Sequence, residues 1–84
     1  MIIERVEKAE LAHIVRRKKK NYYVTSSADQ KGGFATIIYL CDKKGKIKST
    51  PLAEIKCESK EIMRLNHYRV IEHVEEELNE HKEP

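Results

Sequence analysis

The clearest pattern in the chain is a pair of alternating segments around a short polar turn. Residues 34–41 (Phe-Ala-Thr-Ile-Ile-Tyr-Leu-Cys) are rich in β-branched and aromatic side chains, which favours a β-strand. Asp42-Lys43-Lys44-Gly45 then supplies Asp at the start and Gly at the end of a turn. Residues 46–57 return along the first segment, so the pattern predicts a β-hairpin.

The predicted register of this hairpin pairs Cys41 with Lys46, so that Leu40 faces Ile47 and Phe34 faces Ala53. Since side chains alternate across a strand, one face of the hairpin is then the core face. We expect that face to carry Phe34, Thr36, Ile38, Leu40, Ile47, Ala53, Ile55 and Cys57. The other face is mixed, and its Ile37 and Leu52 favour cover by another element or a second subunit. Pro51 lacks an N–H group, which predicts an edge strand or an interruption there.

A C-terminal helix is the second predicted element. Ser59 is a suitable N-cap, because its hydroxyl can accept a hydrogen bond from the first helical turn. Apolar residues then recur at helical spacing, mostly on one side of the predicted helix: Ile62, Met63, Leu65, Val70, Ile71, Val74 and Leu78. We expect this helix to lie across the core face of the sheet, with residues 79–84 frayed.

The segment before the hairpin has two readings. Residues 21–27 read as a strand, and Asp29-Gln30-Lys31-Gly32-Gly33 turns that strand into the hairpin. Residues 7–12 have strong helix propensity, but Ile2, Ile3, Val6 and Ala9 fall on one side of a helical wheel and the next apolar residues fall on the other. Either the segment is a helix that breaks near Ala9, or residues 12–17 form a strand joined to residues 22–25 by a lysine-rich turn.

Both readings give a single α+β domain over residues 1–84, with an antiparallel sheet of three or four strands and a C-terminal helix on one face. The order helix, three strands, helix resembles double-stranded-RNA-binding domains in topology alone. The last helix opens with Ser59-Lys60-Glu61-Ile62 and lacks the lysine-rich first turn of that family, so no function is carried over. The order four strands, then helix, suits a dimeric single-strand binder by shape alone.

Length and charge narrow the functional classes. A chain of 84 residues buries roughly 60% of its unfolded surface, so its core is thin and a homodimer is an option. Residues 1–48 hold 12 Lys/Arg against 5 Asp/Glu, whereas residues 49–84 hold 5 against 9. This polarisation can produce one basic face.

No stretch reaches the roughly 20 apolar residues of a membrane span. The N-terminus does not read as a signal peptide, and two cysteines make no disulfide framework, so we expect a cytoplasmic protein.

The basic segments are the main functional candidate. Lysine and arginine neutralise phosphates and release counterions, and a neighbouring tyrosine can stack on an unpaired base. The alternative is a solvated turn that blocks edge-to-edge strand pairing. We expect sequence-nonspecific contact with DNA or RNA, because no base-reading motif is present. The predicted contact residues are Arg16, Arg17, Lys18, Lys19, Lys20, Tyr22, Tyr23, Tyr39, Lys43, Lys44, Lys46 and Lys48.

No enzymatic constellation is apparent, so we expect neither catalysis nor a cofactor. His73, Glu77 and His81 share a helix face, but they lie in an acidic stretch without a thiol or apolar shell, and we expect no metal site. His67 reads as a packed or exposed histidine without a nucleophile, and the burial of His13 depends on the N-terminal reading. The alternative function is a small regulator or inhibitor that binds another protein through the acidic C-terminal helix or an exposed sheet face.

Overall fold

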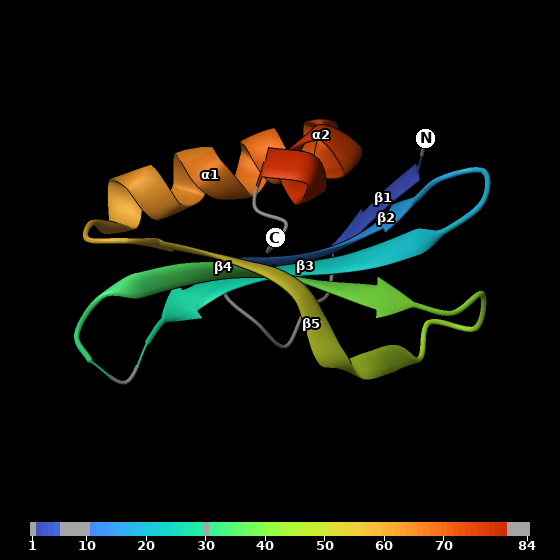
Figure 1. Cartoon of the computed structure of the whole chain (residues 1–84), viewed down its shortest axis with the longest axis horizontal. Coiled ribbons are helices and arrows are strands. Elements are labelled where there is room, and N and C mark those ends of the chain that lie inside the picture. Colours follow the sequence, from blue (N-terminus) through green and yellow to red (C-terminus); the bar gives the residue numbers. More distant parts are fainter. Residues whose placement is uncertain (1, 6–10, 30, 81–84) are drawn as a thin grey trace.

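A computed structural model describes residues 2–5, 11–29 and 31–80 of the chain. Five strands form one antiparallel sheet in the order β1-β2-β3-β4-β5, so each strand pairs with the next along the chain. The strands are β1 (Ile2–Arg5), β2 (Leu11–Arg16), β3 (Asn21–Ala28), β4 (Phe34–Cys41) and β5 (Ile47–Cys57). Two helices follow, α1 (Lys60–Glu72) and α2 (Val74–Glu80), and both lie over the same face of the sheet (Figure 1).

This architecture confirms the predicted α+β class and decides between the two N-terminal readings. Leu11–Arg16 is a strand that pairs with β3 across the lysine-rich turn, and β1 adds one strand to the predicted count. The described part of the chain therefore begins with strands and not with a helix. It does not have the helix, three strands, helix order of double-stranded-RNA-binding domains. Residues 6–10, which include the predicted break near Ala9, lie outside the described residues, as do residues 81–84 of the predicted frayed end.

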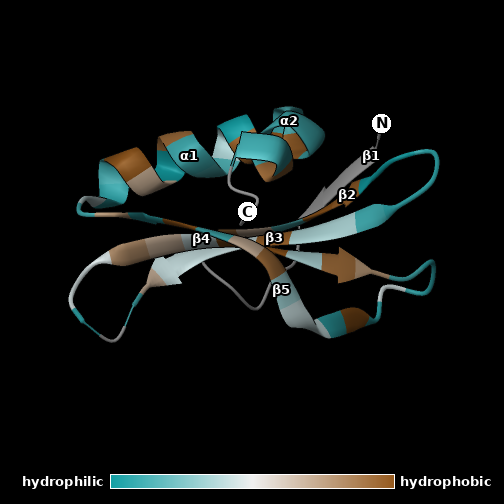
Figure 2. Cartoon of the chain, in the orientation of Figure 1, coloured by the Kyte–Doolittle hydropathy of each residue, from teal (hydrophilic) through white to brown (hydrophobic). Residues whose placement is uncertain are grey.

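The core lies between the sheet and the helices. Val15 and Tyr22 face each other across β2 and β3, and Val24 faces Ile38 across β3 and β4, so alternate positions of these strands present one apolar face. The buried cluster combines that face with the inner side of the helices: Val15, Tyr22, Val24, Ile38, Ala53, Ile55, Val70, Ile71 and Val74. Figure 2 shows hydrophobic (brown) bands between polar (teal) ones along α1, and polar colouring in the turn between β2 and β3.

The register of the predicted hairpin is wrong, although most of its core face is right. Phe34 pairs with Cys57 and Ile38 with Ala53, whereas Tyr39 pairs with Pro51 and Cys41 with Ile47. Irregularities on either side of Tyr39 place extra residues in β5, and they occur where Pro51 has no N–H to donate to the ladder.

Several of the predicted core assignments differ in the structure. Thr36, Ala53 and Ile55 are buried as predicted. Ile47, predicted to be in the core, lies opposite Cys41 and is 41% exposed. Cys41, which is not on the predicted core face, is buried, whereas Phe34, Leu40 and Cys57 of that face are only partly buried.

The C-terminal helix begins as predicted but buries a different stripe. Ser59 caps α1, and its Oγ accepts a hydrogen bond from the backbone N–H of Ile62 at 3.1 Å. The helix is interrupted at His73, and α2 continues from Val74. Ile62 and Leu65 were predicted to be buried, but they are 49% and 72% exposed. The buried positions follow helical spacing and include polar side chains: Met63, Asn66, His67, Val70, Ile71, Val74 and Glu77. Among the described residues, no helix is long and apolar enough to span a membrane.

Candidate functional site

The turn between β2 and β3 carries three exposed lysines and one anchored arginine. Its backbone closes with a hydrogen bond from Arg17 N to Lys20 O at 3.0 Å, and Lys18, Lys19 and Lys20 are exposed. The guanidinium of Arg17 turns back towards the helices, where Nη2 donates to the carbonyl of Glu72 at 3.1 Å and Nε lies 3.3 Å from Glu75 Oε1. Arg17 therefore ties the turn to the end of the helical layer, while the three lysines face solvent.

The turn between β4 and β5 is organised by Asp42. One carboxylate oxygen, Oδ1, accepts hydrogen bonds from the backbone N–H groups of Lys44 at 2.9 Å and Lys46 at 2.8 Å. The backbone of Gly45 has a φ of +88°, a conformation that glycine adopts without strain. This confirms the predicted turn and its use of Asp and Gly. Because the aspartate binds the backbone, the lysine side chains of the turn stay free to face solvent, and Lys43, Lys44, Lys46 and Lys48 are exposed.

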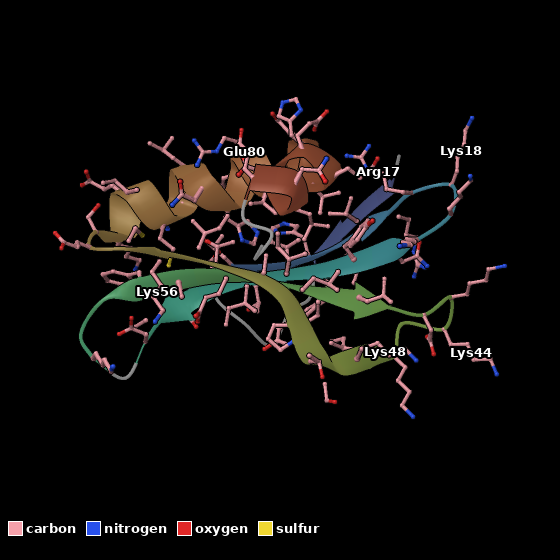
Figure 3. The ribbon with its side chains drawn as sticks, in the orientation of Figure 1. Arg17, Lys18, Lys44, Lys48, Lys56 and Glu80 are labelled. Carbon is pink, nitrogen blue, oxygen red and sulfur yellow. The ribbon has the colours of Figure 1, made fainter. Side chains whose placement is uncertain are left out.

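The two lysine-rich turns lie at the same end of the sheet. In an antiparallel sheet of consecutive strands, every second turn returns to one end, so the β2–β3 and β4–β5 turns are neighbours. The side chain of Asn21, just after the first turn, donates from Nδ2 to the carbonyl of Asp42 in the second at 3.4 Å. Figure 3 shows Lys18, Lys44 and Lys48 projecting from this end and Lys56 from the opposite one. We call the seven exposed lysines the basic end: Lys18, Lys19, Lys20, Lys43, Lys44, Lys46 and Lys48.

Two hollows flank the first turn. The helix-side hollow, of about 580 Å³, is lined by Arg16, Arg17, Lys18, Lys19, Lys20, Tyr22 and Glu75. The inter-turn hollow, of about 330 Å³, is lined by Arg17, Lys18, Lys19, Lys20, Asn21, Leu40, Cys41, Asp42, Lys43 and Lys48. The structure thus brings both predicted basic segments to the rim of one concave surface, although they are far apart in sequence.

Of the tyrosines predicted for the site, Tyr22 lines the helix-side hollow with the basic side chains, whereas Tyr23 and Tyr39 line neither hollow. Tyr22 is 5% exposed and belongs to the core, which leaves little of its ring accessible for stacking on a base. Burial raises the pKa of Tyr22 above its usual value, the carboxylate of Glu75 raises it further, and Arg17 offsets part of the rise. Tyr23 and Tyr39 face each other across β3 and β4, with ring centroids 6.1 Å apart, and are partly buried. They alternate with Tyr22 and Ile38, so they lie on the sheet face that the helices leave uncovered.

A buried polar chain between the sheet and α1 was not predicted. Ser26 Oγ lies 2.7 Å from Thr36 Oγ1 and 2.7 Å from His67 Nδ1, and His67 Nε2 lies 2.8 Å from His13 Nδ1. Burial, and then the charge of His13, lower the pKa of His67 to about 4. A hydroxyl beside an imidazole is a pairing that nucleophilic sites use, but here Ser26 is 1% exposed and His67 is 0% exposed, so both groups are closed off from solvent. The only sequence signal is the polar pair Ser26 and Thr36 at core positions of two strands.

Of the His73, Glu77 and His81 set on the last helix, His81 lies outside the described residues. Glu77 is 5% exposed and its Oε1 lies 2.9 Å from Nε of Arg69, while His73 Nδ1 lies 3.6 Å from Glu76 Oε2. Over residues 2–5, 11–29 and 31–80, no group of three or more His, Cys, Asp or Glu side chains is placed to hold a metal ion.

No protein-family model, curated protein or solved structure matches this chain.

Proposed function

We propose that this chain binds nucleic acids through the basic end, by contacts with the phosphate backbone and without reading sequence. The observation that supports the proposal most is the convergence of two lysine-rich turns on one end of the sheet. Residues 18–20 and 43–48 supply seven exposed lysines from turns that Asn21 and Asp42 link by a hydrogen bond. Such clustering favours a polyanion, because each phosphate that a lysine neutralises releases condensed counterions.

The distribution of acidic side chains supports an approach from the turns rather than from the helices. Glu75, Glu76 and Glu80 of α2 are exposed over the helical face of the molecule, and Glu75 is already paired with Arg17. A nucleic acid laid along the helices would meet these carboxylates. One that crosses the two hairpin turns meets lysines from both, so electrostatics favours the second path.

The test is a titration of a fluorescent oligonucleotide at several salt concentrations. The wild-type chain should bind at low salt and lose affinity steeply as salt rises. The triple variant Lys18→Gln/Lys19→Gln/Lys20→Gln should bind more weakly. The slope of log affinity against log salt should fall by about 0.7 for each single-strand phosphate contact that is lost.

The matched control removes the same charge from the opposite end of the sheet. Lys31 in the β3–β4 turn, Lys56 near the end of β5 and Lys60 at the start of α1 are exposed and lie at the opposite end of the sheet from the basic end. Their triple change to Gln should leave the slope close to that of the wild type. Equal weakening by the two triple variants would show that only net charge matters. No detectable binding by the wild type at low salt would exclude the proposal.

A second candidate is a regulator that binds another protein, and the outer surface of α1 favours it. Ile62, Leu65 and Tyr68 are spaced three residues apart and are 49%, 72% and 48% exposed, which leaves an apolar row facing solvent. A stoichiometric partner captured from nuclease-treated extract, and lost on Leu65→Glu, would support this function. A partner retained equally by Leu65→Glu, or no partner at all, would contradict it.

A further inference from the structure

The two hollows beside the first turn share its basic residues but differ in what else lines them. The helix-side hollow adds Tyr22 and the carboxylate of Glu75. The inter-turn hollow adds Lys43 and Lys48 from the second turn, together with Asp42 and the apolar side chains of Leu40 and Cys41. The difference decides which of the two can accept a phosphate.

The helix-side hollow is unfavourable for an anion despite being larger. Its arginine, Arg17, is already engaged by the Glu75 carboxylate at 3.3 Å and by the carbonyl of Glu72 at 3.1 Å. A phosphate entering there would have to displace Glu75 from Arg17 and then lie beside that carboxylate. Like charges at short range repel, so this hollow is less favourable for phosphate groups than one without a nearby free carboxylate.

The inter-turn hollow has the opposite balance. Six cationic side chains line it, and five of them are lysines from two different turns. Its one carboxylate, Asp42, has Oδ1 occupied by the backbone N–H groups of Lys44 and Lys46 at 2.9 and 2.8 Å. Leu40 and Cys41 add apolar lining on one side, and apolar surroundings strengthen the attraction between lysine and phosphate.

The size and lining of the inter-turn hollow indicate phosphates without bases. A volume of about 330 Å³ is at least that of roughly ten waters, which leaves room for two to three linked phosphate groups. No tyrosine is among the described residues that line it. Base stacking, which gives other single-strand binders much of their affinity, has no platform there.

We infer that the inter-turn hollow is a phosphate-binding subsite that holds two to three linked phosphate groups by charge alone, so that inorganic tripolyphosphate occupies it as readily as a nucleic-acid backbone. The inference rests on the proposed function, because it names the place and the chemical group by which the basic end would hold a nucleic acid. It also extends the ligand class beyond nucleic acids to phosphate chains that carry no base.

The second turn provides a matched pair of variants to test the subsite. Lys43 and Lys48 line the inter-turn hollow, whereas Lys44 and Lys46 are exposed on the same turn outside both hollows. Lys43→Gln/Lys48→Gln and Lys44→Gln/Lys46→Gln therefore remove equal charge a few residues apart. Binding of inorganic tripolyphosphate is measured by calorimetry, and its displacement of a fluorescent oligo-dT by anisotropy. Equal unfolding midpoints confirm that both variants fold.

We expect tripolyphosphate to displace the oligonucleotide competitively. At about 0.15 M salt the Lys43/Lys48 variant should bind it about tenfold or more weakly, and the loss in the Lys44/Lys46 variant should be several-fold smaller, since exposed charges outside the site are partly screened. Equal losses in both variants would overturn the subsite. An oligonucleotide that binds while tripolyphosphate does not would overturn the subsite and leave nucleic-acid binding standing. The reverse result would support the subsite and exclude the proposed function.

Discussion

His67 Nε2 on α1 lies 2.8 Å from His13 Nδ1 on β2, and the other nitrogen of His67 lies 2.7 Å from Ser26 Oγ on β3. A single imidazole therefore links the helical layer to two strands. With His67 neutral, the hydrogen bonds can run in either direction. Donation passes from Thr36 to Ser26 to His67 to His13, or in the reverse order. In both directions every contact pairs one donor with one acceptor, so the tautomers of the two rings are coupled.

Protonation of His67 should destabilise the fold. Its pKa in the folded chain is lowered from 6.5 to about 4, because burial disfavours the charged ring and His13 repels it. The unfolded chain binds this proton first as pH falls, so the stabilisation is complete above about pH 6.5 and is lost progressively towards pH 4. Lowering the pH from about 8 to about 5 should therefore reduce the free energy of unfolding by about 2 kcal/mol through this residue, as measured by urea unfolding.

The control for this pH effect is the exposed histidine between the helices. His67→Asn should flatten the decline in unfolding free energy between about pH 6.5 and pH 5, even if the variant is less stable than the wild type at every pH. His73 is exposed, and His73→Asn should leave the decline unchanged. A His67→Asn variant with the same pH dependence as the wild type would show that other groups cause it.

Ser26→Ala should weaken the same buried chain. The change leaves His67 Nδ1 and Thr36 Oγ1 without the hydroxyl that each contacts at 2.7 Å. An unpaired buried polar group costs roughly 1–3 kcal/mol, so we expect a loss in that range in chemical denaturation. Ser27 is its exposed neighbour on the same strand, and Ser27→Ala should change stability by less than about 0.5 kcal/mol. Equal effects of the two alanine variants would contradict the role of the chain.

Arg69 holds a buried carboxylate between the helices. Its Nε lies 2.9 Å from Glu77 Oε1, and its Nη2 donates to Asn66 Oδ1 at 2.8 Å, while Glu77 is 5% exposed. Arg69→Met should cost about 2 kcal/mol, because it leaves the Glu77 charge buried without that partner. Adding Glu77→Met should recover much of the loss. Arg64→Met, at an exposed position of the same helix, should be near neutral in the same thermal and urea measurements.

Arg17 should contribute less to oligonucleotide binding than its neighbour Lys18, although both line the inter-turn hollow. Glu75 already neutralises much of the Arg17 charge at 3.3 Å, whereas Lys18 is exposed. In anisotropy titrations at low salt, Arg17→Gln should therefore weaken binding less than Lys18→Gln. Glu75→Gln should strengthen binding by releasing Arg17. A loss on Arg17→Gln as large as on Lys18→Gln would show that the guanidinium leaves α2 to bind phosphate.

The sequence predicted the elements of this fold better than their alignment. Residues 34–41 form a strand because of their β-branched and aromatic alternation, and Ser59 caps α1, as expected. The hairpin register failed because extra residues of β5 are accommodated near Pro51, and the pattern of apolar positions does not reveal where a strand bulges. Ile62 and Leu65 are exposed because Asn66 and His67 occupy the buried stripe, and apolar periodicity does not indicate buried polar residues.

The candidate site, like the fold, was only partly predictable from the sequence. The two basic runs can be read directly from the sequence, and a sheet of consecutive hairpins brings both turns to one end. The sequence did not show which of Tyr22 and Tyr23 faces the helices, because that depends on how β3 pairs with β2. The buried contacts of His67 depend on three strands and a helix, so no local sequence pattern predicts them.

The irregular ladder at Pro51 also divides the molecule into two regions with different tolerance to change. On one side of it, Ala53 and Ile55 are buried beneath the helices, whereas every residue from Lys46 to Leu52 is exposed. Substitutions in the exposed stretch therefore remove little packing. This end of the sheet can gain, lose or exchange charges almost independently of folding, so selection or design could retune its ligand while the core stays unchanged.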